Sequence, residues 1–310
     1  MSAGAFLIAA AVAAASPAAL PGWAEEDHAA ALRAYVQTCD LGAAPADEAA
    51  CAEARGLRQA GEADARAFFE RRFTAAPVEG EGLLTAYFTP AYEVRTAPEP
   101  PFVAELPTGP GVGSSPGSGL YLKPEDLFFL QIQGSGLLVT PQDPPRRAVY
   151  AGNNGAPYHA IGRDLVARGA LPQDRASAAA VHAWLADHRG PEADAIMALN
   201  PRRVWFAVAS DDGAEPKGAA GRALVPGRSA AVDPAALPFG ALLWLDADQP
   251  RLAGATPTYR RLVVALDRGA AITGPARADL YLGRGAEAGA EAARVAHRLR
   301  LWRLVARPQP

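Results

Sequence analysis

Two carboxylates at the ends of adjacent short elements near the C-terminus are the feature that most constrains this chain. Residues 261–266 (RLVVAL) read as a buried strand, and this strand ends on Asp267. A turn of small residues follows, and a second short element (ADLYLG) carries Asp279. Because Gly- and Ala-rich turns let adjacent elements approach closely, the two carboxylates can face one cleft. This arrangement suits acid–base chemistry on an ether or glycosidic bond.

Length and charge exclude some classes of function. With 310 residues the chain can bury a good core, in one domain or in two. The net charge is −3 and no basic stripe or run of stacking aromatic residues is present, so we expect no nucleic-acid partner. The Pro and Gly residues are scattered, which favours a loop-rich β architecture.

Residues 1–24 resemble a secretory signal peptide, since an apolar run is followed by small residues that end near Ala19 or Ala24. The start carries no Lys or Arg, and a buried helix or a membrane anchor is the alternative. No Cys follows the apolar run, so we expect no lipoprotein anchor. No other segment is long enough to span a bilayer.

The two cysteines, Cys39 and Cys51, fall in two Ala-rich segments with helical patterns. If the chain is exported, a disulfide that joins a helical hairpin is expected, and two buried free thiols are the alternative. Two Cys without a nearby His cannot complete a zinc shell. The glycines of residues 98–119 lack the strand-then-helix context of a phosphate loop. We therefore expect neither a metal nor a cofactor.

The spacing of apolar residues changes along the chain from a helical to a strand pattern. Residues 25–73 have helical spacing, whereas short strands with Gly, Asn and Pro turns dominate from residue 82 on. The expected strands are 83–88, 127–132, 204–209, 241–246, 261–266 and 302–305, and later helices are expected at 162–168, 175–188 and 286–297.

Elimination leaves acidic residues as the carriers of chemistry. There is no GxSxG motif, and neither the histidines nor the cysteines have a recognisable nucleophilic partner. Asp233, Asp267 and Asp279 each lie at a loop beside a strand. An Asp in a turn most often caps backbone N–H groups, so a structural role for each is the alternative.

Several polar side chains between residues 131 and 158 could form a sugar-binding wall beside aromatic rings. Ordinary turn chemistry is the alternative reading of these residues. They are Gln131, Gln133, Ser135, Asn153, Asn154 and Tyr158.

The chain resembles the membrane-bound lytic murein transglycosylase A (MltA) family from about residue 82 to residue 305. The shared motifs, in order, are TAYFTP, FFLQIQGSGLL, VYAGNNGAPYHAIGRDL, NPRRVWFAV, VPGRSAAVDPAALPFGALLWL, VALDRGAAITGPARADLYLG and GAEAGAEAARVAHRLRLWRLV. The last third resembles the 3D domain, which is named for three aspartates, here Asp233, Asp267 and Asp279.

The resemblance implies a mainly β fold with helices. A double-psi β-barrel domain would use residues 25–89, with N-terminal helices, and 207–310. A second, β-barrel-like domain of residues 90–206 would be inserted, with the substrate groove between the two. By motif position Asp279 matches the catalytic acid/base and Asp267 a supporting carboxylate. The matching substrate-binding positions are Thr85, Tyr87, Gln133, Ser135 and Asp233.

The resemblance also implies a peptidoglycan lytic exotransglycosylase. Such an enzyme cleaves the β-1,4 bond between MurNAc and GlcNAc and leaves 1,6-anhydromuramic acid ends. A hydrolase on the same barrel and a non-catalytic glycan-binding module are the alternatives. We expect a periplasmic monomer, with association with the outer membrane as one option. The expected partners are peptidoglycan glycan strands and cell-wall synthesis or division proteins.

Overall fold

The computed structural model describes residues 15–42, 45–109, 117–173, 176–251, 254–269 and 271–308. Residues 1–14 of the expected signal peptide therefore lie outside the described part. The chain divides into two compact units, of which the first joins Met1–Phe88 to Glu215–Pro310 and the second is Thr89–Ala214. The first unit is thus built from both ends of the chain.

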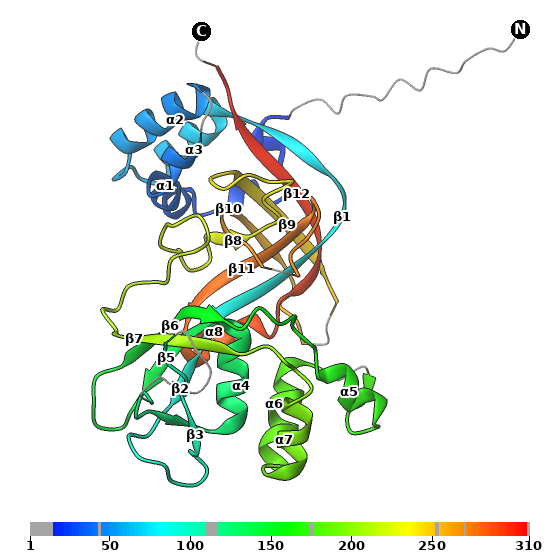
Figure 1. The fold of residues 1–310 in the computed structure, drawn as a ribbon. Coiled ribbons are helices and arrows are strands. Elements are labelled where there is room, and N and C mark those ends of the chain that lie inside the picture. Colours follow the sequence, from blue (N-terminus) through cyan, green and yellow to red (C-terminus); the bar gives the residue numbers. More distant parts are fainter. Residues whose placement is uncertain are drawn as a thin grey trace, which may run out of the picture. The chain divides into compact units, whose positions relative to one another are not determined.

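The first unit contains a closed six-stranded barrel with the strand order β1-β11-β8-β10-β9-β12 (Figure 1). The pairs β1 with β12, β9 with β10, β9 with β12 and β8 with β11 are antiparallel, whereas β8 and β10 run parallel. A fold that is mainly β with helices is therefore confirmed. The barrel strands are β1 (Phe73–Thr89), β8 (Ser229–Ala231), β9 (Leu242–Pro250), β10 (Tyr259–Asp267), β11 (Arg277–Arg284) and β12 (Ala296–Ala306).

The interior of the barrel explains why these segments are strands. β10 is buried continuously from Leu262 to Leu266, as the apolar run predicted. Leu243 and Leu245 of β9 pack with Val263 of β10 and Leu280 of β11 in one cluster. The predicted strands at 83–88, 241–246, 261–266 and 302–305 are confirmed, although β1 and β12 are longer than expected.

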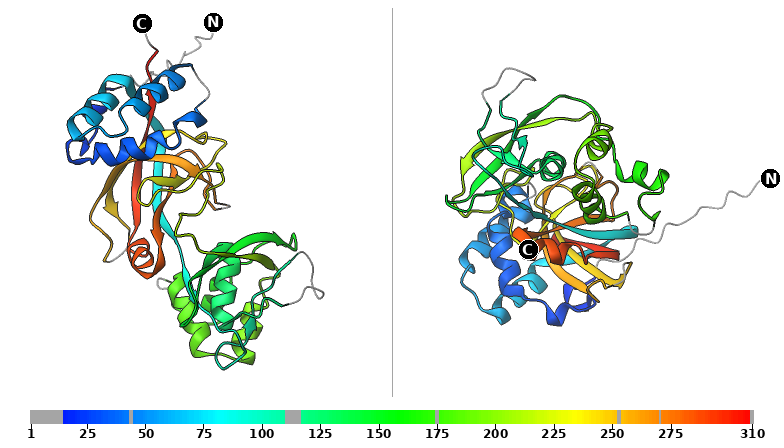
Figure 2. Two further views of the ribbon diagram at one scale, coloured as in Figure 1. Left: turned by 90° about the vertical axis from the view of Figure 1, so that its left-hand side faces the viewer. Right: turned by 90° about the horizontal axis from the view of Figure 1, so that it is seen from below.

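Helices pack against one end of the barrel in the first unit (Figures 1 and 2). They confirm the helical pattern of residues 25–73, and Phe68 and Phe69 pack with Trp244 and Leu266 of the barrel in a second cluster. These elements are η1 (Pro17–Ala19), η2 (Trp23–Glu25), α1 (His28–Val36), η3 (Cys39–Leu41), α2 (Pro45–Gly56) and α3 (Glu62–Arg72), and α8 (Gly285–Ala292) follows β11.

A disulfide joins Cys39 of η3 to Cys51 of α2, with a Cα–Cα distance of 5.2 Å. Of the two possibilities left open by the sequence, the bridged pair is the one observed. Both sulfur-bearing residues are buried in the cluster that the helices share with the barrel. The bridge therefore holds η3 against α2 at the surface of the barrel.

The segment just before α1 is part of this core. Ala15 exchanges two backbone hydrogen bonds with Ala75 of β1, of 2.9 and 2.8 Å. Trp23 is 1% exposed, and its ring lies 5.3 Å from that of Trp244. The Trp23 Nε1–H donates to Glu70 Oε1 at 3.0 Å. A mature chain that began at residue 20 or residue 25 would lack some or all of these contacts.

The second unit contains a four-stranded sheet, a two-stranded sheet and helices, with two apolar clusters of its own. The larger sheet has the order β2-β5-β6-β7, with β2 and β5 parallel and the other pairs antiparallel. Its elements are β2 (Ala91–Glu93), β3 (Ala104–Glu105), β4 (Tyr121–Leu122), α4 (Pro124–Gln133), β5 (Ser135–Val139), β6 (Arg146–Asn153), α5 (Gly162–Ala167), α6 (Ala178–Asp187), α7 (Pro191–Met197) and β7 (Val204–Ser210).

The strand expected at residues 127–132 is wrong, because these residues lie in helix α4. Pro124 stands in the first turn with Glu125 and Asp126, and Gly134 ends the helix in the left-handed conformation with φ of 79°. Pro and acidic residues favour a helix start, and a left-handed Gly favours a helix end. These flanking signals identify a helix, whereas the apolar run alone does not.

Candidate active site

Asp279 lies on β11 in a half-buried position between Ala278 and Leu280, both of which are fully buried. The Thr85 hydroxyl of β1 donates a hydrogen bond to Asp279 Oδ1. Thr85 Oγ1 in turn accepts from Arg277 Nη2 at 2.8 Å. Because Arg277 donates to the Thr85 oxygen, the hydroxyl hydrogen of Thr85 is left to point at the carboxyl group of Asp279.

Burial raises the pKa of Asp279 above its ordinary value. The charge of Asp267 adds to this effect, while the Thr85 hydrogen bond and the positive charge of Arg277 oppose it and leave the pKa raised. Burial is thus the larger cause of the raised pKa, and repulsion from Asp267 is the smaller one. A carboxyl group in this state can carry a proton at a pH where an exposed Asp cannot.

Arg277 is itself half-buried, and burial lowers the pKa of its guanidinium group. Its Nη1 donates to the carbonyl oxygens of Leu83 at 3.1 Å and Ala278 at 2.6 Å. The guanidinium group is thus fixed between β1 and β11. Arg277 and Asp279 stand two residues apart on one strand, so both side chains leave the same face.

Asp267 lies at the end of β10 and accepts hydrogen bonds from three donors. The Tyr87 hydroxyl donates to Oδ2 at 2.7 Å, and the backbone N–H groups of Ala219 and Arg268 each donate to Oδ1 at 2.9 Å. Burial and the neighbouring Asp267 charge raise the pKa of Tyr87, so this hydroxyl keeps its proton. The carboxyl group of Asp267 is therefore oriented from several sides.

The barrel register brings the two carboxylates near each other. Asp267 of β10 and Asp279 of β11 are both register partners of Ala231, which lies on β8 between these strands. Two interstrand spacings separate their backbones, which corresponds to about 9–10 Å. Thr85 and Tyr87 lie two residues apart on β1. Thr85 contacts Asp279, and Tyr87 contacts Asp267. The structure thus brings together four of the seven residues predicted for the site.

Aromatic rings pack next to the two carboxylates. The rings of Tyr87 and Tyr281 lie 5.2 Å apart, and Tyr281 is fully buried. The Tyr281 hydroxyl donates to Glu215 Oε2 at 2.6 Å. These rings exclude water from one side of the site, which strengthens electrostatic interactions between the groups there.

Asp233 follows β8, and its carboxylate contacts backbone groups. Its Oδ1 accepts from the Ala235 N–H at 3.0 Å and its Oδ2 from the Gly274 N–H at 2.7 Å. These two hydrogen bonds hold the pKa of Asp233 below its ordinary value. Asp233 thereby ties the loop after β8 to the turn that connects Asp267 with Asp279, which supports a structural role.

Gln133 and Ser135 belong to the second unit. Gln133 is the exposed last residue of α4, and Ser135 is the half-buried first residue of β5. Within the described ranges, no group of three or more His, Cys, Asp or Glu side chains is placed to hold a metal ion.

Two contributors to the site were missed from the sequence. Arg277 stands two residues before Asp279, so strand alternation would have placed it on the same face. The Ala219 N–H lies 48 residues from Asp267 in the chain, and no side-chain signal marks it. A backbone donor of this kind becomes visible only in the fold.

Two known domain families match parts of the chain by sequence. The MltA specific insert domain matches residues 113–207, and the 3D domain matches residues 228–305. The membrane-bound lytic murein transglycosylase A of Escherichia coli K12 is 32% identical over 249 residues, which cover 74% of this chain and 67% of that protein. The chain spans about two thirds of the length of the curated relatives that it matches.

Solved structures agree with this match over nearly the whole chain. The lytic transglycosylase LtgG of Burkholderia pseudomallei has a TM-score of 0.69 at 32% identity, covering 97% of this chain and 96% of that one. E. coli MltA with bound chitohexaose has a TM-score of 0.74 at 26% identity, covering 91% and 90%. The double-psi barrel expected from the sequence is consistent with these folds. The chain belongs to the membrane-bound lytic murein transglycosylase A family.

Proposed function

We propose that this protein is a lytic transglycosylase that cleaves the β-1,4 bond between MurNAc and GlcNAc in peptidoglycan, with Asp279 as the single acid/base. The observation that carries the proposal is the half-buried Asp279, whose pKa is raised and whose Oδ1 is held by Thr85. The names of the relatives support the reaction class, and the chitohexaose bound to E. coli MltA supports a glycan strand as substrate.

The reaction needs one proton donor that later becomes an acceptor. Protonated Asp279 gives its proton to the glycosidic oxygen, the bond from C1 to that oxygen breaks, and positive charge develops at C1. The 6-hydroxyl of the same muramyl residue then attacks C1, and the Asp279 carboxylate accepts the hydroxyl proton. Asp279 thus regains the proton that it gave, no water is consumed, and the product is a 1,6-anhydro end.

Asp267 supports this chemistry without entering it. Hydrogen bonds from Tyr87, Ala219 and Arg268 already occupy three of the roughly four lone-pair positions of the Asp267 carboxylate and fix its orientation. Its negative charge contributes to the raised pKa of Asp279. Asp267 therefore tunes and orients the acid, and Tyr87 holds Asp267.

The products of digestion test the reaction class directly. Purified sacculi digested with the protein are expected to release fragments that are lighter by one water than hydrolysis products, as read by mass spectrometry. Fragments with reducing ends would instead show a hydrolase. Retention on sacculi without any release would show a glycan-binding module.

Thr85→Val tests the hydrogen bond to Asp279. Because the Thr85 hydroxyl lowers the pKa of Asp279, its removal is expected to raise this pKa further. Activity is lost as the pH rises through the pKa of a catalytic acid, so the alkaline limb of kcat/KM should move to higher pH. Thr85→Ser keeps the hydroxyl and should retain the wild-type limb. An unchanged limb in Thr85→Val, or a shift to lower pH, would contradict the assignment.

We also propose that the protein acts in the periplasm after export, in association with the outer membrane. The apolar N-terminal run, the disulfide between Cys39 and Cys51, and the membrane-bound relative support this location. No helix in the described ranges has the length and hydrophobicity that a membrane span requires. Since Trp23 belongs to the core, signal cleavage is proposed to occur upstream of Trp23, near the expected site at Ala19 and not at Ala24.

A further inference from the structure

A loop of the first unit holds Asp267 through its backbone. Residues 216–224 form a narrow hairpin, in which Lys217 pairs with Ala223 and the Gly218 N–H donates to the Arg222 carbonyl at 2.9 Å. At its tip the Ala219 N–H donates to Asp267 Oδ1 at 2.9 Å, and the Ala220 N–H donates to the Leu266 carbonyl at 3.0 Å. We call residues 216–224 the Arg222 loop.

The tip of the Arg222 loop lies very close to β10. A Cβ atom added at Gly218 would lie 2.4 Å from the Leu266 carbonyl oxygen, so only Gly fits there without a shift. The loop therefore cannot move along β10 without breaking the hydrogen bonds to Leu266 and Asp267. Any element that fixes the loop also fixes the donor on Asp267.

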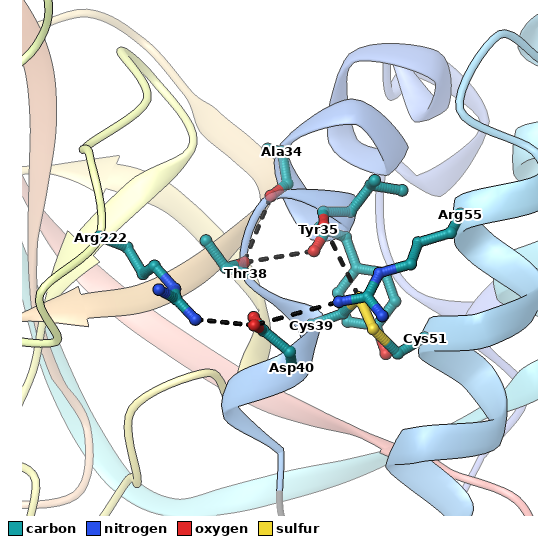
Figure 3. The surroundings of a disulfide bond; sticks show 9 residues. Ala34, Tyr35, Thr38, Cys39, Asp40, Cys51, Arg55 and Arg222 are labelled. Atoms are coloured by element: carbon teal, nitrogen blue, oxygen red, sulfur yellow. Dashed lines mark hydrogen bonds and ion pairs between the residues drawn. A yellow bond between two sulfur atoms is a disulfide. The ribbon is translucent and has the colours of Figure 1, made fainter.

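Arg222 anchors the loop to the helical part of the unit. Its Nη2 donates to Asp40 Oδ2 at 2.7 Å, across 182 residues of chain. Figure 3 shows the Asp40 carboxylate between the guanidinium groups of Arg222 and Arg55, and Arg55 lies farther away, at 4.0 Å. Both partners of the closer pair are about two fifths exposed, at 41% and 42% of the side chain.

The disulfide determines where Asp40 stands. Asp40 is the middle residue of η3, a single short turn between α1 and α2. Next to it, Cys39 is bonded to Cys51 of α2, and the Thr38 hydroxyl donates to the Ala34 and Tyr35 carbonyls at 3.3 Å (Figure 3). A three-residue turn has little stability of its own, so these neighbours hold it in place.

We propose that Arg222 is a positioning residue for the active site. It connects the Cys39–Cys51 bridge, through Asp40 and the Arg222 loop, to the backbone donor on Asp267. Reduction of the bridge by a dithiol, which is oxidised to its own disulfide while Cys39 and Cys51 become thiols, then loosens the loop and lowers turnover, so the activity is sensitive to thiol reductants. This inference rests on the proposed function for its kinetic consequence, and on geometry alone for the loop.

The expected effects are modest, because an ion pair of two partly exposed groups is worth up to about 1 kcal/mol, or roughly fivefold. Arg222→Ala should lower kcat on purified glycan strands by about threefold to fivefold while KM changes little, since Arg222 contacts the loop and not the substrate. Hydrogen exchange of residues 216–224 should rise by a similar factor.

Arg55→Ala is the matched control, since it removes the second arginine beside Asp40 without touching the loop. It should leave both kcat and the exchange of residues 216–224 unchanged. The charge-reversed pair Asp40→Arg with Arg222→Asp should recover most of the lost activity. Cys39→Ser with Cys51→Ser, and wild type treated with a reductant, should reproduce the effect of Arg222→Ala.

Two readouts keep this inference separate from the proposed function. If wild type releases no anhydro products, the proposed function fails, yet the exchange measurement still tests the loop. If wild type is active and Arg222→Ala keeps wild-type kcat and loop protection, the positioning role is wrong. Equal losses in Arg222→Ala and Arg55→Ala would also overturn it, because the effect would then be a general change in surface charge.

Discussion

Asp279→Asn is expected to lower turnover of peptidoglycan by on the order of 10²–10⁴, which is the contribution of a positioned general acid/base. The amide is close to the carboxyl group in shape, and its oxygen can still accept the hydrogen bond from Thr85. It can neither give a proton to the glycosidic oxygen nor take one from the 6-hydroxyl. The loss should therefore fall on kcat, measured as release of soluble fragments from sacculi.

Folding of this variant should be preserved or improved. Burial raises the pKa of Asp279, so the native state disfavours the charged form. The unfolded chain ionises at the ordinary pKa, and ionisation above that pH favours unfolding of the wild type. The advantage of Asn over Asp in melting temperature should therefore grow as the pH rises from 4 to 7. A lower melting temperature at neutral pH would show that the loss of activity is structural.

Asp267→Asn distinguishes a mechanism with one catalytic carboxylate from a mechanism with two. Asp267 is a supporting residue whose oxygens are held by Tyr87 and two backbone N–H groups. Its neutralisation should therefore lower turnover less, by on the order of tenfold. Equal losses for the two Asn variants would contradict the single-acid mechanism and favour a dyad that acts as a unit. The same comparison fixes the order of importance that the sequence suggested by motif position alone.

The sequence predicted the parts of the molecule that local patterns encode. A continuously apolar run between turns identified β10 and the Asp267 at its end, whereas Asp279 lies within β11 and was singled out by motif position. Helical spacing identified the elements that carry Phe68 and Phe69. In each case neighbours within a few residues determine the structure.

Contacts between distant segments could not be predicted in the same way. The hydrogen bond from the Ala219 N–H to Asp267 and the pair of Arg222 with Asp40 join residues 48 and 182 positions apart. The larger role of burial in raising the pKa of Asp279 depends on how the barrel packs around β11. At α4 the apolar run suggested a strand, and the helix signals at Pro124 and Gly134 were decisive.

Trp23→Ala is expected to lower the free energy of unfolding by about 3–5 kcal/mol, the range for loss of a fully buried Trp. Trp23 is 1% exposed, packs on Trp244 and donates a hydrogen bond to Glu70, so its removal leaves a cavity and takes one of two hydrogen bonds from Glu70 Oε1, which still accepts from Arg66 Nε at 2.7 Å. Chemical denaturation followed by circular dichroism measures the change. Trp302→Ala is the control, because Trp302 is only partly buried and lies at the edge of the same cluster. This substitution should lower the free energy of unfolding by less.

The same contacts set the expected start of the exported protein. Cleavage after Ala24 removes Trp23 and cleavage after Ala19 removes Ala15, which pairs with Ala75 of β1. The first cleavage removes a core side chain, whereas the second keeps Trp23 and leaves a leader of ordinary length. The intact mass of protein recovered from the periplasm should therefore include Trp23. A mature chain that begins at residue 25 and is as stable as one that keeps Trp23 would show that this segment is dispensable.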